Sequence, residues 1–159
     1  MYFIFLASAA ATLNGWASWS VSYYDHITSQ AYEVRTEVGS IKSPQDDPKY
    51  WFRETNSKSK SIRWTTSDDC KDAKYLLFSI NNISVPEFSV PGSGKKSAAI
   101  QPPDTQSYSI KAPGTFNGKS NAIIDISAST QPQISLWYKK AALTLEKCWS
   151  KSKPNFIND

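Results

Sequence analysis

The chain has 159 residues, of which 40% are hydrophobic and 20% charged, and its formal net charge is +4. This composition excludes a disordered chain, and the length predicts one domain with a sizeable core. The positive charge is small and its lysines and arginines are scattered along the chain, so we expect no nucleic-acid partner.

The N-terminus carries a pattern typical of a secretory signal. Met1–Leu6 is apolar, and the small residues of Ala7–Ala11 follow, with two A-x-A sites of the kind that signal peptidase cleaves. We therefore expect residues 1–11 to be a signal peptide and residues 12–159 to form the domain, with a short basic C-terminal tail. The segment before the apolar run has no Lys or Arg, so the alternative is a first β-strand of a cytosolic protein.

The two cysteines, Cys70 and Cys148, agree with secretion because a cysteine pair in a secreted chain usually forms a disulfide. Closing a loop of this length stabilises a fold by about 4.5 kcal/mol in the chain-entropy model. The alternative is two buried thiols. One N-glycosylation acceptor pattern, Asn82-Ile83-Ser84, also fits an extracellular protein and predicts a glycan on Asn82.

Alternating apolar and polar residues predict β-strands along most of the chain. Trp16–Tyr24 and Tyr32–Ile41 show this alternation most clearly, and Gly39 is expected to mark a bulge or an end of the second strand. Tyr75–Ile80 has large apolar residues on both faces, which predicts a central strand. Further expected strands are Tyr50–Glu54, Ile62–Thr65, Glu87–Val90 at an edge, Ser97–Gln101, Ser107–Ile110, Asn121–Ser127 and Gln133–Tyr138.

Two further segments complete this interpretation. Ala112–Gly114 contains Pro and Gly and is expected to be a turn. Ala141–Trp149 has leucines two positions apart, which favours a strand, although its Ala, Leu, Glu and Lys content leaves a terminal helix as the alternative. The whole pattern predicts an all-β, single-domain antiparallel β-sandwich with one disulfide; a small β-barrel is the alternative.

Catalytic and metal-binding patterns are nearly absent from the sequence. The single histidine, His26, is not accompanied by a G-x-S-x-G motif, and two cysteines with one histidine cannot supply a four-ligand zinc site. The carboxylate pairs Asp46/Asp47 and Asp68/Asp69 lie in turn sequences that explain them without catalysis. We therefore expect a protein that is not an enzyme and that holds no cofactor or metal.

Aromatic residues make up 13% of the chain and are the best remaining indication of function. Trp16, Trp51 and Trp149 stand beside loops or chain ends, where exposed rings can stack on sugars or lie at lipid interfaces. Tyr50 and Arg53 flank Trp51, and in a strand Trp51 and Arg53 share one face. These five residues are the candidate ligand-binding set; the alternative is that the aromatic rings pack in the core.

The sequence thus predicts a small secreted binding or effector-type protein that recognises a host or cell-surface partner, protein or glycan, through exposed aromatics. We expect it to be a monomer. The alternative is a membrane-binding β protein whose positive charge favours an anionic membrane surface.

Overall fold

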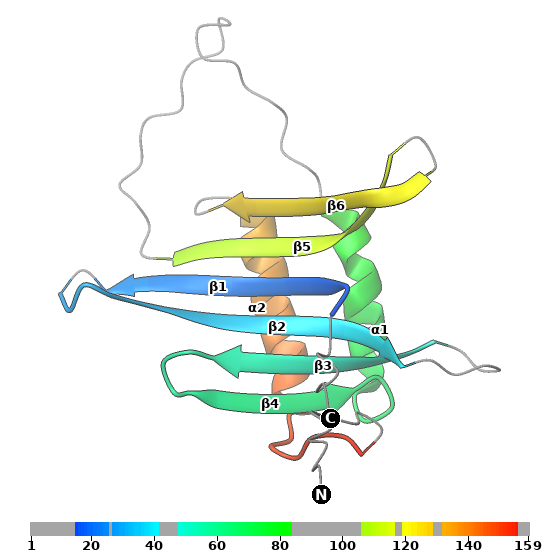
Figure 1. Cartoon of the computed structure of the whole chain (residues 1–159), viewed down its shortest axis with the longest axis horizontal. Helices are drawn as coiled ribbons and strands as arrows, with labels where there is room; N and C mark the ends of the chain where they lie inside the picture. Colours follow the sequence, from blue (N-terminus) through cyan, green and yellow to red (C-terminus); the bar gives the residue numbers. More distant parts are fainter. Residues whose placement is uncertain are drawn as a thin grey trace, which may run out of the picture.

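The computed structural model describes residues 15–25, 27–41, 48–83, 106–116, 119–128 and 132–155. Within these ranges six strands form one antiparallel sheet, and two α-helices lie behind it and run across its strands (Figure 1). The strands are β1 (Ala17–Asp25), β2 (Gln30–Ile41), β3 (Lys49–Asn56), β4 (Ser61–Thr66), β5 (Gln106–Phe116) and β6 (Lys119–Ala128). The helices are α1 (Lys71–Phe78), a short 3-10 helix η1 (Ser79–Asn82) and α2 (Pro132–Glu146).

The sheet is built from two antiparallel units that meet in its middle. Its strand order is β4-β3-β2-β1-β5-β6, so β1 to β4 are each beside their neighbour in sequence, and so are β5 and β6. The two units join where β5 pairs with β1, with Ser18 opposite Lys111 and Tyr23 opposite Gln106. Each unit is followed in sequence by one helix, α1 after the first and α2 after the second.

The two tight turns of the first unit are made in the same way. Asp25 Oδ1 accepts hydrogen bonds from the backbone N–H groups of Ile27 and Thr28, at 2.8 and 3.3 Å. Asn56 Oδ1 likewise accepts from the N–H groups two and three residues on, at 3.0 and 3.1 Å. Each turn ends with a residue at a φ of 53°, Ser29 or Lys60. Short polar side chains that mimic a backbone turn therefore set both strand connections.

One face of the sheet is buried under the helices. In β1, Ala17, Trp19 and Val21 point to this side and are at most 3% exposed. Trp19 contacts Phe52 of β3, with ring centroids 6.3 Å apart, and Trp137 of α2, at 5.2 Å. These residues belong to one core that both helices complete. The opposite face of the sheet has no helix of the described residues on it.

Three segments expected to be strands belong to the helices instead. Tyr75–Ile80 overlaps α1, where Ala73, Leu76 and Leu77 are buried with the three- and four-residue spacing of a helix face. Gln133–Tyr138 and most of Ala141–Trp149 form α2, whose buried residues also recur at helical spacing. These are Ile134, Trp137, Tyr138, Ala141 and Leu145. For α2 the strand interpretation was wrong because it treated the buried face of one helix as two separate short segments.

Other expectations are confirmed or corrected within the sheet. The strands expected at Trp16–Tyr24, Tyr32–Ile41, Tyr50–Glu54, Ile62–Thr65, Ser107–Ile110 and Asn121–Ser127 are present as β1 to β6. Ala112–Gly114 is not a turn but lies inside β5, next to an irregularity in its pairing with β6 between Gly114 and Phe116. Gly39 lies within the regular pairing of β2 and marks neither a bulge nor an end.

The mostly β, antiparallel class and the disulfide are confirmed. The sheet is open and does not close into the barrel of the alternative, and the layer packed on it consists of α1 and α2, where a sandwich places a second sheet. Several expectations lie outside the described residues: the signal peptide at 1–11, the strands at 87–90 and 97–101, His26, Asp46 and Asp47.

The disulfide joins the two helices at one end. Cys70 directly precedes α1 and Cys148 lies two residues after α2, and their Cα atoms are 5.5 Å apart. The bridge spans a sequence separation of 78 residues, which includes both helices, β5 and β6. Cys70 is 3% exposed, so the bridge is part of the core.

Replacing Cys70 and Cys148 together with serine is expected to lower the free energy of unfolding by about 4 kcal/mol, because the unfolded chain regains the entropy of a long loop. Urea unfolding of the oxidised protein and the variant measures this difference. Unfolding in the presence of a thiol reductant serves as control. The reductant is expected to lower the urea midpoint of the parent protein and leave that of the variant unchanged. Equal midpoints for oxidised and reduced parent protein would contradict the prediction.

Tyr138 gives the fold a dependence on alkaline pH. Burial raises the pKa of its hydroxyl above the usual value of 10.0, and nearby Tyr23 and Glu54 act in the same direction. The folded state therefore favours the neutral phenol. The contribution of Tyr138 to the free energy of unfolding is complete below about pH 10, and it is lost as the pH rises further and the hydroxyl ionises. We expect Tyr138→Phe to lose less stability than the parent between pH 8 and 10.5 in urea unfolding. An equal loss in both proteins would be the contrary result.

Candidate functional site

The open face of the sheet carries its side chains in ordered cross-strand rows. Residues directly opposite each other in an antiparallel sheet share a face, so the pairing register identifies each row. The row that we call the charged row crosses all six strands as Trp64, Arg53, Glu37, Ser18, Lys111 and Asp125. Beside it, the hydroxyl row consists of Ile62, Thr55, Arg35, Ser20, Ser109 and Ser127.

A groove of about 690 Å³ crosses this open face. Its shape follows from side-chain size, because Ser18 of β1 is short while Glu37 and Lys111 on either side of it are long. Ala17, whose side chain points to the helical face, also lines the hollow. Arg35, Glu37 and Arg53 form one wall, from β2 and β3. The remaining lining residues are Gly15 and Trp16 before β1, Lys111 and Pro113 of β5, and Ile123 of β6. We call this hollow the sheet-face groove.

The wall from β2 and β3 is held by a carboxylate between two guanidinium groups. Arg53 Nε donates to Glu37 Oε2 at 2.8 Å, and Arg53 Nη2 donates to the same oxygen. Arg35 Nε lies 3.6 Å from the other carboxylate oxygen, and its Nη2 donates to Ser18 Oγ at 3.5 Å. Arg53 also stacks on the Trp64 ring, 5.6 Å from its centroid. Charge-assisted bonds of this kind fix planar groups in place, so the wall is pre-arranged.

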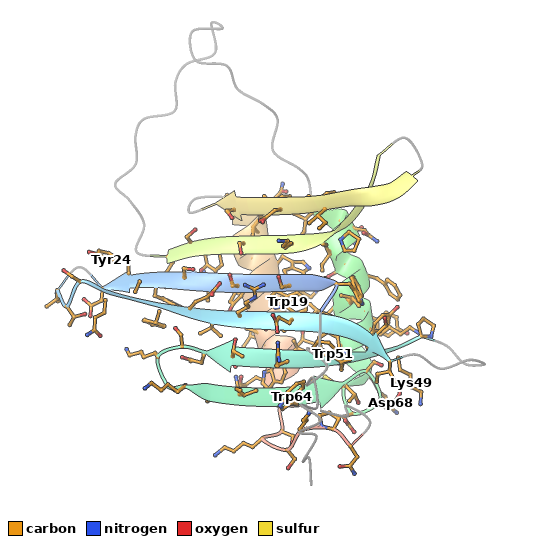
Figure 2. The ribbon with its side chains drawn as sticks, in the orientation of Figure 1. Trp19, Tyr24, Lys49, Trp51, Trp64 and Asp68 are labelled. Carbon is orange, nitrogen blue, oxygen red and sulfur yellow. A yellow bond between two sulfur atoms is a disulfide. The ribbon has the colours of Figure 1, made fainter. Side chains whose placement is uncertain are left out.

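Trp51 and Trp64 lie on neighbouring strands of the open face but are not exposed (Figure 2). They are 4% and 7% exposed, their ring centroids are 6.1 Å apart, and Ile41 packs against them. The Trp51 indole lies directly over Gly39, where an added Cβ would be only 2.3 Å from two ring carbons. The absence of a side chain at Gly39 is what makes room for the ring.

The five candidate ligand-binding residues do not form one site. Trp16 and Arg53 both line the sheet-face groove. Trp51 was expected to be exposed, but its ring is covered, which removes it as a stacking surface. Tyr50 is 9% exposed and belongs to the core under the helices, where its ring contacts Trp16 edge-to-face at 6.0 Å.

Trp149 lies away from the groove, in a cluster around Arg63. Arg63 donates to Glu54 at 2.7 and 2.9 Å and to Glu146 of α2 at 3.0 and 3.1 Å, and its guanidinium stacks on Trp149 at 5.4 Å. Next to this cluster, Ser150 exchanges two backbone hydrogen bonds with Trp64 at the edge of the sheet, at 2.7 and 2.8 Å. Trp149 is thus part of a structural contact between sheet, helix and C-terminal segment, and its position gives no support to ligand binding.

The sequence reasoning identified only Trp16 and Arg53 among the groove residues. It missed Gly15, Ala17, Ser18, Arg35, Glu37, Lys111, Pro113 and Ile123. Alternation along Tyr32–Ile41 did place Arg35 and Glu37 on one face of a strand. Nothing in the local sequence indicated that Lys111 would lie on the same face as Arg35 and Glu37, two strands away from them. Its place depends on the register of β5 against β1.

The acidic pair Asp68/Asp69 and the glycosylation acceptor Asn82 lie outside the groove. Thr66 Oγ1 donates to the Asp69 carboxylate at 2.8 Å, and Lys49 pairs with Asp68 at 2.9 Å (Figure 2), so both carboxylates serve the turn before α1. Asn82 is exposed at the end of η1. Among the residues that the structure covers, no three His, Cys, Asp or Glu side chains gather as a metal site.

Comparison with protein-family models, curated proteins and solved structures finds no match. In the described part of the chain, neither helix is long and apolar enough to span a membrane.

Gly39→Ala is expected to destabilise the protein by about 1 to 3 kcal/mol, because the new methyl group would displace the Trp51 indole. Urea unfolding measures the change. The matched control is Ser40→Ala, at the next and exposed position, for which we expect a change below about 0.5 kcal/mol. If both variants unfold like the parent, the close packing of Trp51 on Gly39 is refuted.

Proposed function

We propose that this protein is an extracellular, non-enzymatic binding protein that recognises a saccharide of a host or cell surface in the sheet-face groove. The observation that carries the proposal is the groove itself. Trp16, which is partly exposed, is among its lining residues, beside a wall of fixed Arg and Glu side chains. Planar aromatic and planar polar groups together suit a ring that has an apolar face and a polar edge.

Trp16 supplies the apolar contact in this proposal. The residue is 39% exposed, and its ring makes an edge-to-face contact with Tyr50 at 6.0 Å. Ile123 of β6 also lines the groove and is 71% exposed. Pro113 of β5 lies opposite Ile123 and also lines the groove, so this end of it is apolar. Apolar side chains can contact the face of a sugar, and a rigid ring loses little entropy on binding.

The carboxylates argue against glycoside hydrolysis. Hydrolases of this kind use two carboxyl groups on either side of the bond that is cleaved. Among the described residues of the groove lining there is one carboxylate, Glu37, and both of its oxygens already face arginine side chains. This arrangement supports binding without turnover.

An extracellular location is supported by the disulfide. Bridges such as Cys70–Cys148 form and persist in oxidising compartments and are rare in the cytosol. The signal pattern at residues 1–11 and the acceptor Asn82 point to the same compartment.

A second candidate function is binding to an anionic membrane surface, and the outer side of the helical layer favours it. Tyr75 and Phe78 of α1 and Leu136 and Leu143 of α2 are 51 to 77% exposed. Exposed lysines accompany them, at Lys71, Lys139, Lys140 and Lys147. Apolar side chains mixed with cations are typical of helices that lie on anionic lipid.

Trp16→Ala is expected to weaken saccharide binding about tenfold, because the exposed ring is the main apolar contact of the groove. Co-sedimentation with a panel of insoluble polysaccharides measures it. Tyr75→Ala is the matched control, since Tyr75 is 77% exposed on the opposite side of the molecule.

The same assay with anionic vesicles tests the second candidate. Binding to vesicles that is lost in Tyr75→Ala and kept in Trp16→Ala would replace the saccharide proposal with the membrane one. If no polysaccharide sediments the parent protein, or if both variants lose polysaccharide binding equally, the groove is not a saccharide site.

A further inference from the structure

The charge of the sheet-face groove is uneven, and this bears on the class of ligand. Among the described residues that line it, three side chains are cationic, Arg35, Arg53 and Lys111, and one is a carboxylate, Glu37. A concave surface with an excess of one charge attracts ligands of the opposite charge. The groove is therefore better suited to an anion than to a neutral molecule.

The three cations differ in how much of their bonding capacity is already used. Arg53 directs two N–H groups at Glu37 and stacks on Trp64, so its guanidinium is committed. Arg35 has only long contacts, at 3.5 and 3.6 Å, and its side chain is 44% exposed. Lys111 is exposed on β5. Arg35 and Lys111 are thus the cations with donors that can turn to a ligand.

Arg35 and Lys111 stand on opposite sides of β1. Their strands β2 and β5 both pair with β1, so the two backbones lie about 10 Å apart, which is two strand spacings. The register offsets the two residues along the strands, because Arg35 lies opposite Ser20 and Lys111 opposite Ser18. The Arg35 side chain bridges this offset, since its Nη2 lies 3.5 Å from Ser18 Oγ, and both residues line the groove. One anionic group lying over Ser18 would then receive hydrogen bonds from both sides.

We propose that the ligand of the sheet-face groove is an acidic saccharide, whose carboxylate or sulfate group binds between Arg35 and Lys111 while its ring lies against Trp16. This inference rests on the proposed function and narrows it from saccharides in general to anionic ones. Asp125 follows Lys111 in the charged row, opposite it on β6 and exposed, and it opposes the binding of an anion at this place.

The test compares ligands that share a skeleton and differ in charge. Binding of a galacturonate oligosaccharide and of its methyl ester is measured by calorimetry, and a sulfated disaccharide with its desulfated form separates the two anionic groups. We expect the parent protein to bind at least one acidic form about tenfold more tightly than its neutral counterpart.

Variants that remove a positive or a negative charge are expected to change the affinity in opposite directions, which identifies the site. Arg35→Gln and Lys111→Gln are each expected to weaken acidic binding about tenfold and to change neutral binding little. Asp125→Asn is expected to strengthen acidic binding about twofold. Lys139→Gln, on the exposed side of α2, is the control for attraction to the overall positive charge and is expected to have no effect.

The outcomes separate the two proposals. Equal affinity for acidic and neutral forms, with both lost in Trp16→Ala, would overturn the acidic ligand and leave saccharide binding in place. Equal weakening by Lys139→Gln and Lys111→Gln would show unspecific attraction and overturn the acidic site. Absence of binding to every saccharide would overturn both.

Discussion

The contact of Trp19 with Trp137 is the interaction on which the rest of the structure depends. Trp19 is 2% exposed in the middle of the sheet, and the Trp137 ring of α2 meets it edge-to-face at 5.2 Å. The indole N–H of Trp137 then donates to Ser79 Oγ at 2.8 Å, which ties α2 to η1 just after α1. This chain of contacts covers one face of the sheet with both helices, and the disulfide fastens them to each other at their far end. The opposite face is thereby left without a helix of the described residues, and it carries the sheet-face groove.

The strands could be predicted from the sequence because each half-buried strand alternates within its own few residues. The helices could not be predicted from segments as short as Tyr75–Ile80 and Gln133–Tyr138. In α1, Leu76 and Leu77 form an apolar pair that resembles a buried strand, and only Ala73, outside that window, reveals the helical spacing. In α2, Leu143 and Leu145 suggest alternation, yet Leu143 is 74% exposed and Leu145 is 1% exposed. An exposed leucine on a helix surface thus imitated one face of a strand.

The candidate site was harder to predict than the fold, since exposure depends on tertiary contacts. Trp51 stands next to a loop rich in Pro and Asp, which favoured exposure, but the bare backbone at Gly39 on the next strand gives its ring a place to lie. Trp16 and Arg53 were identified from their surroundings in sequence. Lys111 joins them through strand register alone, because a shift of one residue between β1 and β5 would turn it to the helical side.

The groove also lies across the seam between the two halves of the sheet. Arg35 belongs to the unit of β1 to β4, and Lys111 to the unit of β5 and β6, while the Ser20 and Ser109 hydroxyls meet across the seam at 3.0 Å. A ligand bound to both halves, as proposed, would hold them together, since separating the halves would require its release. Occupancy would therefore add to the cooperativity of the whole domain, and the free energy of binding would appear as resistance of this seam to opening.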